Sequence, residues 1–374
     1  MNARSWSLIA LCWLLVGASA TELRIMSWNI GRAIGANSPN SAQQPYVAKI
    51  ANYLKPDIWI LHEVGGNTPG WNPLAQEAAL ISFVQSNLTY YGPNPQPGVN
   101  FYVYANRNSD GWISSAIISR YRFVEISDVN IGAPNRGLTI GWIDVPGTNG
   151  LGVFAAHFKA GGYTDDAVKR QTNAERTREQ VRRWRLNHRR SAYVLGGDLN
   201  ENEDPDLNSL FDIGGTLPDG RTYAPISTVK SARLRDHMPV DAQNGKRTYR
   251  VTTRNSDLRH RFDYLLVSEA EWGRDRINVL EAILFNTRRF PAGTLPPGFD
   301  INDSPNASDH APVFLRVRID RWEAGSYWGG GGNAPEPSTV IQLLIMTSGG
   351  LIYLRIRSFT RRGRRGTGSS GTTP

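Results

Sequence analysis

The hydrophobic and polar positions of residues 21–322 follow two periods, which predict a mixture of strands and helices. Leu23 to Trp28 alternates as a strand does, whereas the apolar residues from Val47 to Leu54 recur at the spacing of an amphipathic helix. Further helices are predicted at 74–88 and 164–188. Short apolar runs bounded by turn residues predict strands at 58–61, 101–104, 115–119, 138–143, 153–156, 192–195, 262–267 and 312–317.

The order of these elements indicates an α+β fold. A strand-helix-strand start, then hairpin-like strands and a long helix, suits two packed sheets with helices outside them. Residues 200–260 and 286–308 are rich in loop-forming residues, and no repeat of solenoid or propeller period occurs. We expect one domain over 21–322, because the candidate site residues described below span it from end to end.

The first twenty residues have the three parts of a secretory signal peptide. Arg4 supplies the positive charge, Trp6 to Val16 is apolar, and Ala18-Ser19-Ala20 is a small-residue cleavage site. A buried first helix is the alternative, but the order of the three parts favours export through the Sec translocon.

The C-terminus has a composition of its own. A Gly/Pro linker is expected at 323–337, followed at 338–374 by an apolar, potentially membrane-spanning stretch (Val340 to Leu354) and six arginines. The positive-inside rule places this basic tail in the cytoplasm and the main domain outside. A buried core helix is the alternative, but it would not carry six arginines at one end.

With Pro335-Glu336-Pro337 before it, this tail resembles the PEP-CTERM sorting signal of certain Gram-negative bacteria. The resemblance implies recognition by an exosortase-type membrane transpeptidase and removal of the tail. It also implies delivery to the cell envelope or the extracellular space after transient anchoring in the membrane.

Charge and cysteine content narrow the function classes. The formal charge is +9, of which Arg4 contributes +1 and residues 335–374 contribute +5, which leaves +3 for 21–334. That value is too small to argue nucleic-acid binding from charge alone. The single cysteine, Cys12, lies in the signal peptide, which excludes disulfides and cysteine nucleophiles in the main domain.

Six short motifs of acids, amides and histidines stand at the ends of apolar runs. Their convergence would form one pocket of oxygen ligands and two imidazoles. They are Ser27-Trp28-Asn29-Ile30, Leu61-His62-Glu63, His157-Phe158-Lys159, Gly196-Gly197-Asp198-Leu199-Asn200, Arg261-Phe262-Asp263-Tyr264 and Ser308-Asp309-His310.

Glu63, Asp309 and Asn29 are the candidate metal-site residues. Mg²⁺ is usually bound through one or two carboxylates and leaves its other positions to water and phosphate; Mn²⁺ is also possible. Taken alone, Glu63 is better explained as an exposed loop acid, and the company of Asp309 and Asn29 favours a ligand.

Asp198 and Asn200 are candidates for holding an attacking water and a phosphoryl oxygen. In extended backbone, side chains two residues apart face the same way, and the glycines before them allow close approach of a substrate. An Asx-rich turn is the alternative.

Two histidines complete the candidate site. His310 can stabilise a pentacoordinate phosphate, with Asp263 orienting its ring, and His157 ends another strand. His62 and the remaining histidines are expected to be structural or solvated. The arginine-rich segment 170–190 is expected to be the solvated face of a helix rather than a nucleic-acid site.

Together these motifs resemble, in their order, the endonuclease/exonuclease/phosphatase superfamily, which includes pancreatic-type DNases, abasic-site endonucleases, inositol polyphosphate 5-phosphatases and bacterial sphingomyelinases. The resemblance covers about residues 22–320. It implies a four-layer α/β/β/α sandwich of the DNase-I-like type, with a single catalytic domain. It also implies divalent-metal hydrolysis of phosphodiesters without a covalent intermediate.

Residue by residue, the motifs and the resemblance give three groups. These are the metal ligands Asn29, Glu63 and Asp309, the substrate-binding Asn29, Asn200 and His157, and the catalytic His157, Asp198, Asn200, Asp263 and His310. In one place the sequence departs from the family. DNase-like members support the second histidine with a glutamate, and the nearest acid here, Asp110, is badly placed for that role.

The sequence therefore predicts an exported, monomeric, Mg²⁺-dependent phosphodiesterase, first of all a nuclease acting on DNA or RNA. One alternative is a phosphomonoesterase or a lipid-headgroup phosphodiesterase. Another is a matrix protein that keeps the fold and has lost catalysis.

Overall fold

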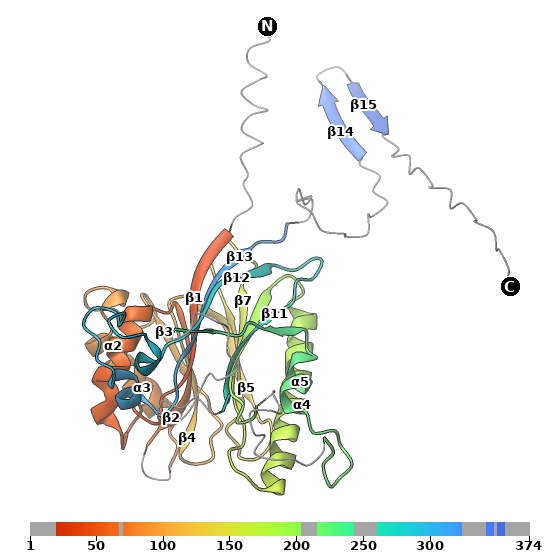
Figure 1. The fold of residues 1–374 in the computed structure, drawn as a ribbon. Coiled ribbons are helices and arrows are strands. Elements are labelled where there is room, and N and C mark those ends of the chain that lie inside the picture. Colours follow the sequence, from red (N-terminus) through yellow and green to blue (C-terminus); the bar gives the residue numbers. More distant parts are fainter. Residues whose placement is uncertain are drawn as a thin grey trace, which may run out of the picture. The chain divides into compact units, whose positions relative to one another are not determined.

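Two β-sheets lie face to face and carry helices on their outer faces (Figure 1). The computed structural model describes residues 20–66, 70–202, 215–242 and 260–323, and the strands at 342–347 and 350–355. The α+β sandwich predicted from the sequence is confirmed, and the described residues between 20 and 323 belong to one compact unit.

The first sheet has seven strands. They are β1 (Ala20–Asn29), β2 (Ile58–Gly65), β3 (Tyr102–Ala105), β4 (Ile113–Ser119), β10 (Val240–Asp241), β12 (Arg276–Leu284) and β13 (Val313–Asp320). Their order is β10-β12-β13-β1-β2-β4-β3. β1 pairs parallel with β2 and antiparallel with β13, so the first and last strands of the domain are neighbours.

The second sheet has six strands. They are β5 (Phe123–Val129), β6 (Leu138–Ile143), β7 (Leu151–His157), β8 (Ala192–Asp198), β9 (Leu234–Asp236) and β11 (Asp263–Ser268). Their order is β5-β6-β7-β8-β11-β9. β8 lies between β7, to which it is parallel, and β11, to which it is antiparallel.

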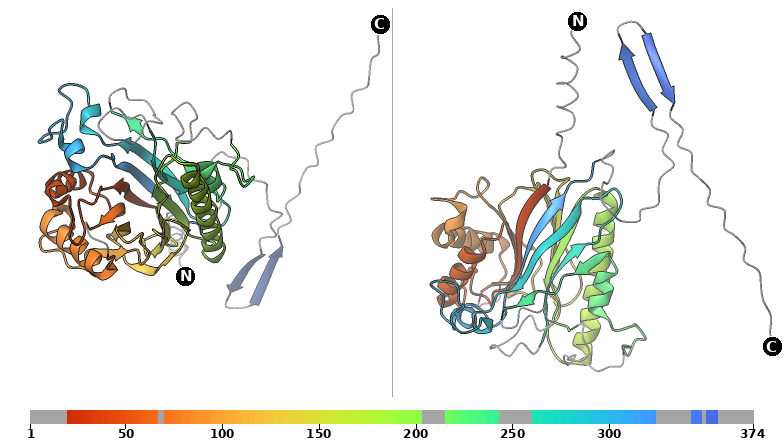
Figure 2. Two further views of the ribbon diagram at one scale, coloured as in Figure 1. Left: turned by 90° about the horizontal axis from the view of Figure 1, so that it is seen from below. Right: turned by 45° about the horizontal axis from the view of Figure 1, so that its top comes forward.

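Helices cover both outer faces, which makes four layers. Figure 1 shows α2 (Gln44–Leu54) and α3 (Pro73–Asn87) beside the seven-stranded sheet, and α4 (Thr164–Asn187) and α5 (Pro225–Lys230) beside the six-stranded sheet. Figure 2 shows α4 along the outside of that sheet from two further directions. Shorter elements are η1 (Ser41–Gln43), η2 (Thr89–Tyr91), η5 (Thr287–Arg289) and α6 (Asp303–Ala307).

The layers enclose three apolar cores, and strand alternation assigns residues to them. On β1, Leu23 and Ile25 face the core between the sheets, whereas Met26 and Trp28 face the helices α2 and α3. A strand buried on both faces needs apolar residues at nearly every position. This explains why the central strands form continuous apolar runs in the sequence.

The predicted elements that carry the motifs are present. The helix predicted at 164–188 is α4, and the one predicted at 74–88 is α3, each within one residue at either end. β5 and β12 were not predicted, because their residues are largely exposed or half-buried and therefore mix polar with apolar side chains.

The C-terminal segment forms a second unit, Tyr327–Pro374. The structure describes two antiparallel strands there, β14 (Gln342–Thr347) and β15 (Gly350–Arg355), where the sequence predicts a membrane-spanning segment. Within the described part of the chain, no helix is long and apolar enough to cross a membrane. The predicted signal peptide, up to residue 19, and most of the predicted linker lie outside the described residues.

Truncation of the core between the sheets tests this packing. Leu315 is fully buried there, and we expect Leu315→Ala to lower the free energy of unfolding by about 2–5 kcal/mol, because it leaves a cavity. Leu186 on α4 is 60% exposed, and Leu186→Ala should change the free energy of unfolding by less than about 0.5 kcal/mol. Equal losses in urea unfolding of the two variants would contradict the assignment of the core.

Candidate active site

Strand register brings the predicted residues to one end of the sandwich. In the six-stranded sheet, Asp198 at the end of β8 pairs with His157 on β7 and with Asp263 on β11. In the other sheet, Asn29 at the end of β1 pairs with His62 on β2. These rows of residues meet, because Asn29 contacts Asp198 across the two sheets.

A β-bulge turns Glu63 toward this end of the sheets. The pairing of β2 with β4 shifts between Leu61 and Val64, and Glu63 has a left-handed φ of 54°. A bulge re-aims a side chain at some cost in backbone strain. The neighbouring His62 is fully buried and contacts Ser27 and Ser115, whereas the Glu63 side chain is 28% exposed.

Asn29 joins the two carboxylates. Its Nδ2 donates to Glu63 Oε1 at 3.1 Å and to Asp198 Oδ2 at 2.8 Å. Its Oδ1 accepts a hydrogen bond from the backbone N–H of Gly31 at 3.0 Å, which fixes the orientation of the amide. Asn29 is completely buried and therefore acts here as a rigid donor to the acids.

His310 is paired with Asp263. Its Nδ1 donates to Asp263 Oδ2 at 2.7 Å, and its Nε2 lies 3.9 Å from Asp198 Oδ2. Burial by itself lowers the pKa of His310, but the negative charges of Asp263, Asp198 and Asp309 raise the pKa to about 10. His310 is therefore an imidazolium at neutral pH, as its predicted role requires.

The pKa of Asp198 lies near neutral pH. Burial and the nearby charge of Asp263 raise the pKa of Asp198 to about 7, against the opposing effects of His310 and of the Asn29 amide. A carboxyl group of this kind exchanges a proton near physiological pH, which suits a group that holds an attacking water.

His157 has a partner that the sequence did not reveal. Its Nε2 lies 2.8 Å from Arg136 Nη1, and Arg136 Nε donates to Asp110 Oδ2 at 2.9 Å. Burial and the Arg136 charge hold the pKa of His157 well below its usual range. His157 is therefore neutral, and its Nε2 accepts a hydrogen bond from Arg136. The positive charge lies on the Arg136 guanidinium, which stands between Asp110 and the His157 imidazole.

No sequence signal singles out Arg136. It stands in an Asn-Arg-Gly turn between β5 and β6, and nothing local distinguishes it from other loop arginines. Its side chain is 12% exposed, and its Nη2 makes no hydrogen bond or ion pair to any described residue.

The backbone at Asn200 is not extended, so the argument from extended backbone is wrong there, and the role of Asn200 stays a prediction. β8 ends at Asp198, and Asn200 has a left-handed φ of 51°. Its Nδ2 donates to the Phe158 carbonyl at 3.1 Å, and its backbone N–H donates to Asp198 Oδ1 at 3.1 Å. This local geometry is that of an Asx turn, the alternative considered above.

Asp309 lies at the rim of the site. It is exposed, and its carboxylate belongs to neither of the clusters of three potential ligands found among the described residues. An ideal Cβ on Gly31 would lie 3.5 Å from Asp309 Oδ1, so the carboxylate borders the loop after Asn29. Its role as a metal ligand stays a prediction.

The arginine-rich helix α4 is not solvated throughout. Arg170 is completely buried and pairs with Glu201, Nε to Oε2, at 3.2 Å. This ion pair ties α4 to the segment that follows Asp198. The prediction of a solvated outer face holds for Arg183, whose side chain is 65% exposed.

The donor set fits a divalent cation. Potential ligand atoms of Glu63, His157 and Asp198 lie within 4.8 Å of one another, as do those of Asp198, Asp263 and His310. His157 Nε2 already accepts from Arg136, and His310 is cationic, so the oxygens of Glu63 and Asp198 are the suitable ligands. Carboxylate oxygens are the ligands that Mg²⁺ prefers.

Comparisons with known proteins bear on the family and the fold of this chain. A sequence model of the Endonuclease/Exonuclease/phosphatase family matches residues 26–310. A comparison with curated proteins finds no match.

Three solved structures are similar to this chain. A family protein from Bacteroides thetaiotaomicron is 16% identical, with a TM-score of 0.51, over 81% of this chain and 96% of that one. One from Leptotrichia buccalis C-1013-b is 14% identical, with a TM-score of 0.50, over 79% and 99%. A mannosyl-6-phosphatase of Bacteroides thetaiotaomicron VPI-5482 is 15% identical, with a TM-score of 0.49, over 79% and 99%.

The His310–Asp263 pair predicts a pH-dependent stability. The folded-state pKa of about 10 lies above the ordinary value of 6.5, so the pair stabilises the fold fully below about pH 6.5. This contribution is lost as the pH rises toward 10. In metal-free urea unfolding, Asp263→Asn should therefore lower stability more at pH 6 than at pH 9.5. An equal loss at both values would mean that His310 is not protonated by this pair.

Proposed function

The chain belongs to the endonuclease/exonuclease/phosphatase family, and we propose that it is a divalent-metal-dependent phosphodiester hydrolase whose substrate is a nucleic acid. One observation carries the proposal. Glu63 and Asp198, joined by Asn29, lie opposite a cationic His310, and the Arg136 guanidinium reaches the same cluster through His157. Negative groups for a metal and positive groups for a phosphate thus converge.

The side chains of the site have different roles in the proposed hydrolysis. Asp198, with its pKa near 7, orients and deprotonates the attacking water. His310 and Arg136 offer N–H donors to the phosphoryl oxygens, where charge grows in the transition state. A Mg²⁺ or Mn²⁺ ion held by Glu63, which leaves Asp198 available to accept the proton, would supply Lewis-acid stabilisation of the same charge.

The alternatives differ in measurable ways. A nuclease that neutralises several phosphates weakens steeply with salt, whereas a phosphomonoesterase or a lipid-headgroup enzyme does not. The complete set of acids and cations speaks against an inactive matrix protein. Calorimetry that found no Mg²⁺ or Mn²⁺ binding would favour that alternative.

We also propose that the protein is exported. The support is in the sequence: the signal peptide at 1–20 and the tail at 338–374, which resembles a PEP-CTERM signal. On this proposal the Sec translocon and an exosortase-type transpeptidase are its partners, and the mature monomer acts in the envelope or outside the cell. Mass spectrometry of the mature protein from the native host tests both cleavages.

Plasmid nicking tests the proposed activity. We expect nicking with Mg²⁺, none with EDTA, and a loss of roughly 100-fold or more in Asp198→Asn, because the attacking water loses its base. Asp144→Asn is the matched control, since Asp144 follows β6 at the opposite end of the sheet and its side chain is 60% exposed. Full activity in Asp198→Asn would remove Asp198 from the mechanism.

Replacement of Arg136 tests the second cation. Arg136→Gln should lower kcat/KM by about 10²–10³-fold, because a donor to the phosphoryl oxygens is lost. Arg122→Gln is the control, since Arg122 is 61% exposed and pairs with Asp144. If Arg136→Gln kept its kcat/KM, Arg136 would serve only to position His157.

A further inference from the structure

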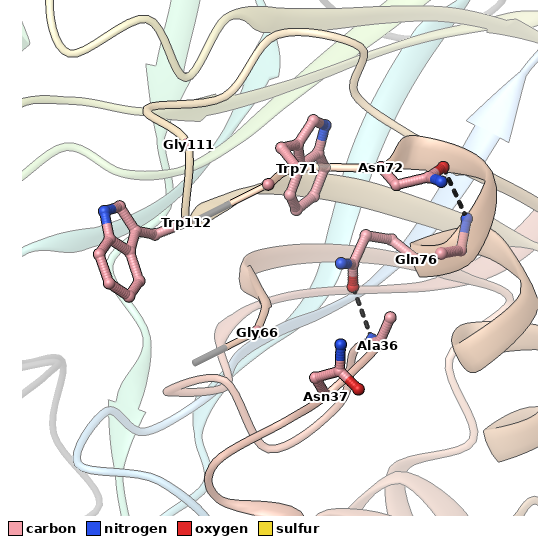
Figure 3. Close-up of a pocket in the computed structure, with 10 residues that line it drawn as sticks. Ala36, Asn37, Gly66, Trp71, Asn72, Gln76, Gly111 and Trp112 are labelled. Atoms are coloured by element: carbon pink, nitrogen blue, oxygen red, sulfur yellow. Dashed lines mark hydrogen bonds between the residues drawn. The ribbon is translucent and has the colours of Figure 1, made fainter. Parts of the chain in front are cut away.

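Figure 3 shows a pocket, of about 210 Å³, whose lining residues follow candidate site residues closely along the chain. Several residues that line the pocket belong to the same chain segments as the candidate site residues. Asn37 lies on the loop after β1, Gly66 lies three residues after Glu63, and Trp112 lies two residues after Asp110. Three residues of extended chain span at most about 11 Å, so the pocket is close to Glu63.

Two tryptophans line the pocket. Trp71 is fixed, because its Nε1 donates to the Asn106 carbonyl at 2.9 Å. Trp112 is held by its backbone, whose carbonyl accepts from the Gly66 N–H at 3.4 Å, and its side chain is 42% exposed. An exposed indole ring offers a flat apolar face to a planar ligand.

Gln76 supplies a donor inside the pocket. Its Oε1 accepts from the Ala36 N–H at 2.8 Å, so its Nε2 points the other way. Figure 3 shows this nitrogen turned to the side where Gly66 and Trp112 lie. Gln76 is only 4% exposed, and its Nε2 has no hydrogen-bond partner among the described residues. This nitrogen is not among the fully buried unpaired atoms of the described residues, so it is open to the pocket and can donate to a ligand that brings an acceptor.

None of the described residues that line the pocket carries a charge. Its occupant is therefore neutral and flat and bears hydrogen-bond acceptors, which describes a nucleobase. We propose that this pocket binds a base of the substrate, stacked on Trp112 and hydrogen-bonded to Gln76, while the attached phosphate lies at Glu63 and Asp198. This inference rests on the proposed function and names its substrate class.

Binding without turnover tests the pocket alone. In EDTA, calorimetry with AMP and with ribose 5-phosphate isolates the contribution of the base. We expect AMP to bind the wild type about tenfold more tightly than ribose 5-phosphate, since stacking of one base contributes about 1–3 kcal/mol. Trp112→Ala should abolish this difference and Trp112→Phe should keep most of it. Gln76→Glu keeps the acceptor for Ala36, removes the donor and should weaken AMP alone.

Turnover provides the second measurement. With the p-nitrophenyl ester of thymidine 5′-phosphate, Trp112→Ala should raise KM about tenfold with little change in kcat. With methyl p-nitrophenyl phosphate, which has no base, it should change neither. Trp112→Ala could also lose AMP binding and still cleave a single-stranded oligonucleotide as the wild type does. That result would mean that the pocket binds the base of a free nucleotide rather than of a polymer.

The failures of the two proposals differ. If the wild type neither nicked plasmid nor cleaved either ester, the proposed function would fail, whereas a preference for AMP that depends on Trp112 would still support the base pocket. If Trp112→Ala bound AMP as the wild type does, or weakened AMP and ribose 5-phosphate alike, the base pocket would be refuted whatever the activity. If Trp112→Ala weakened the binding of ribose 5-phosphate but not that of AMP, the pocket would be a sugar site instead.

Discussion

The site depends on how three carboxylates are held close together, two of them out of contact with water. Asp198 and Asp263 are almost completely buried, and Glu63 lies on the far side of the Asn29 amide. Burial and mutual repulsion both disfavour this charge. The Asn29 donor and the His310 cation compensate for it. Because Asn29 ends β1 and His310 precedes β13, two paired strands at the centre of one sheet, the compensation depends on the register of the whole sandwich.

The same site holds its two histidines in different charge states. His310 faces an acid, Asp263, and stays protonated, whereas His157 faces Arg136 and stays neutral. The departure from the family noted in the sequence thus has a physical explanation. A positive partner replaces the negative one, and the cation moves from the imidazole to the guanidinium.

Rigid and variable parts of the site come from different elements. The acids and histidines stand at strand ends, where pairing fixes their positions. The pocket at Trp112 and Gln76 is built from the loops beyond those strands and from the start of α3. Loops on a rigid scaffold are where enzymes of one fold differ in substrate, and here the proposed base recognition is confined to them.

The sequence by itself determined the sandwich, its central strands and helices, and the residue types of the site, because periodicity and short motifs are local properties. It did not predict Arg136 beside His157, the turned Asn200, the exposed Asp309 or the pocket at Trp112. These depend on which loops meet across the two sheets and on how deeply each group is buried. Only the tertiary structure decided them, because a partner distant in the chain sets both the direction and the charge of a side chain.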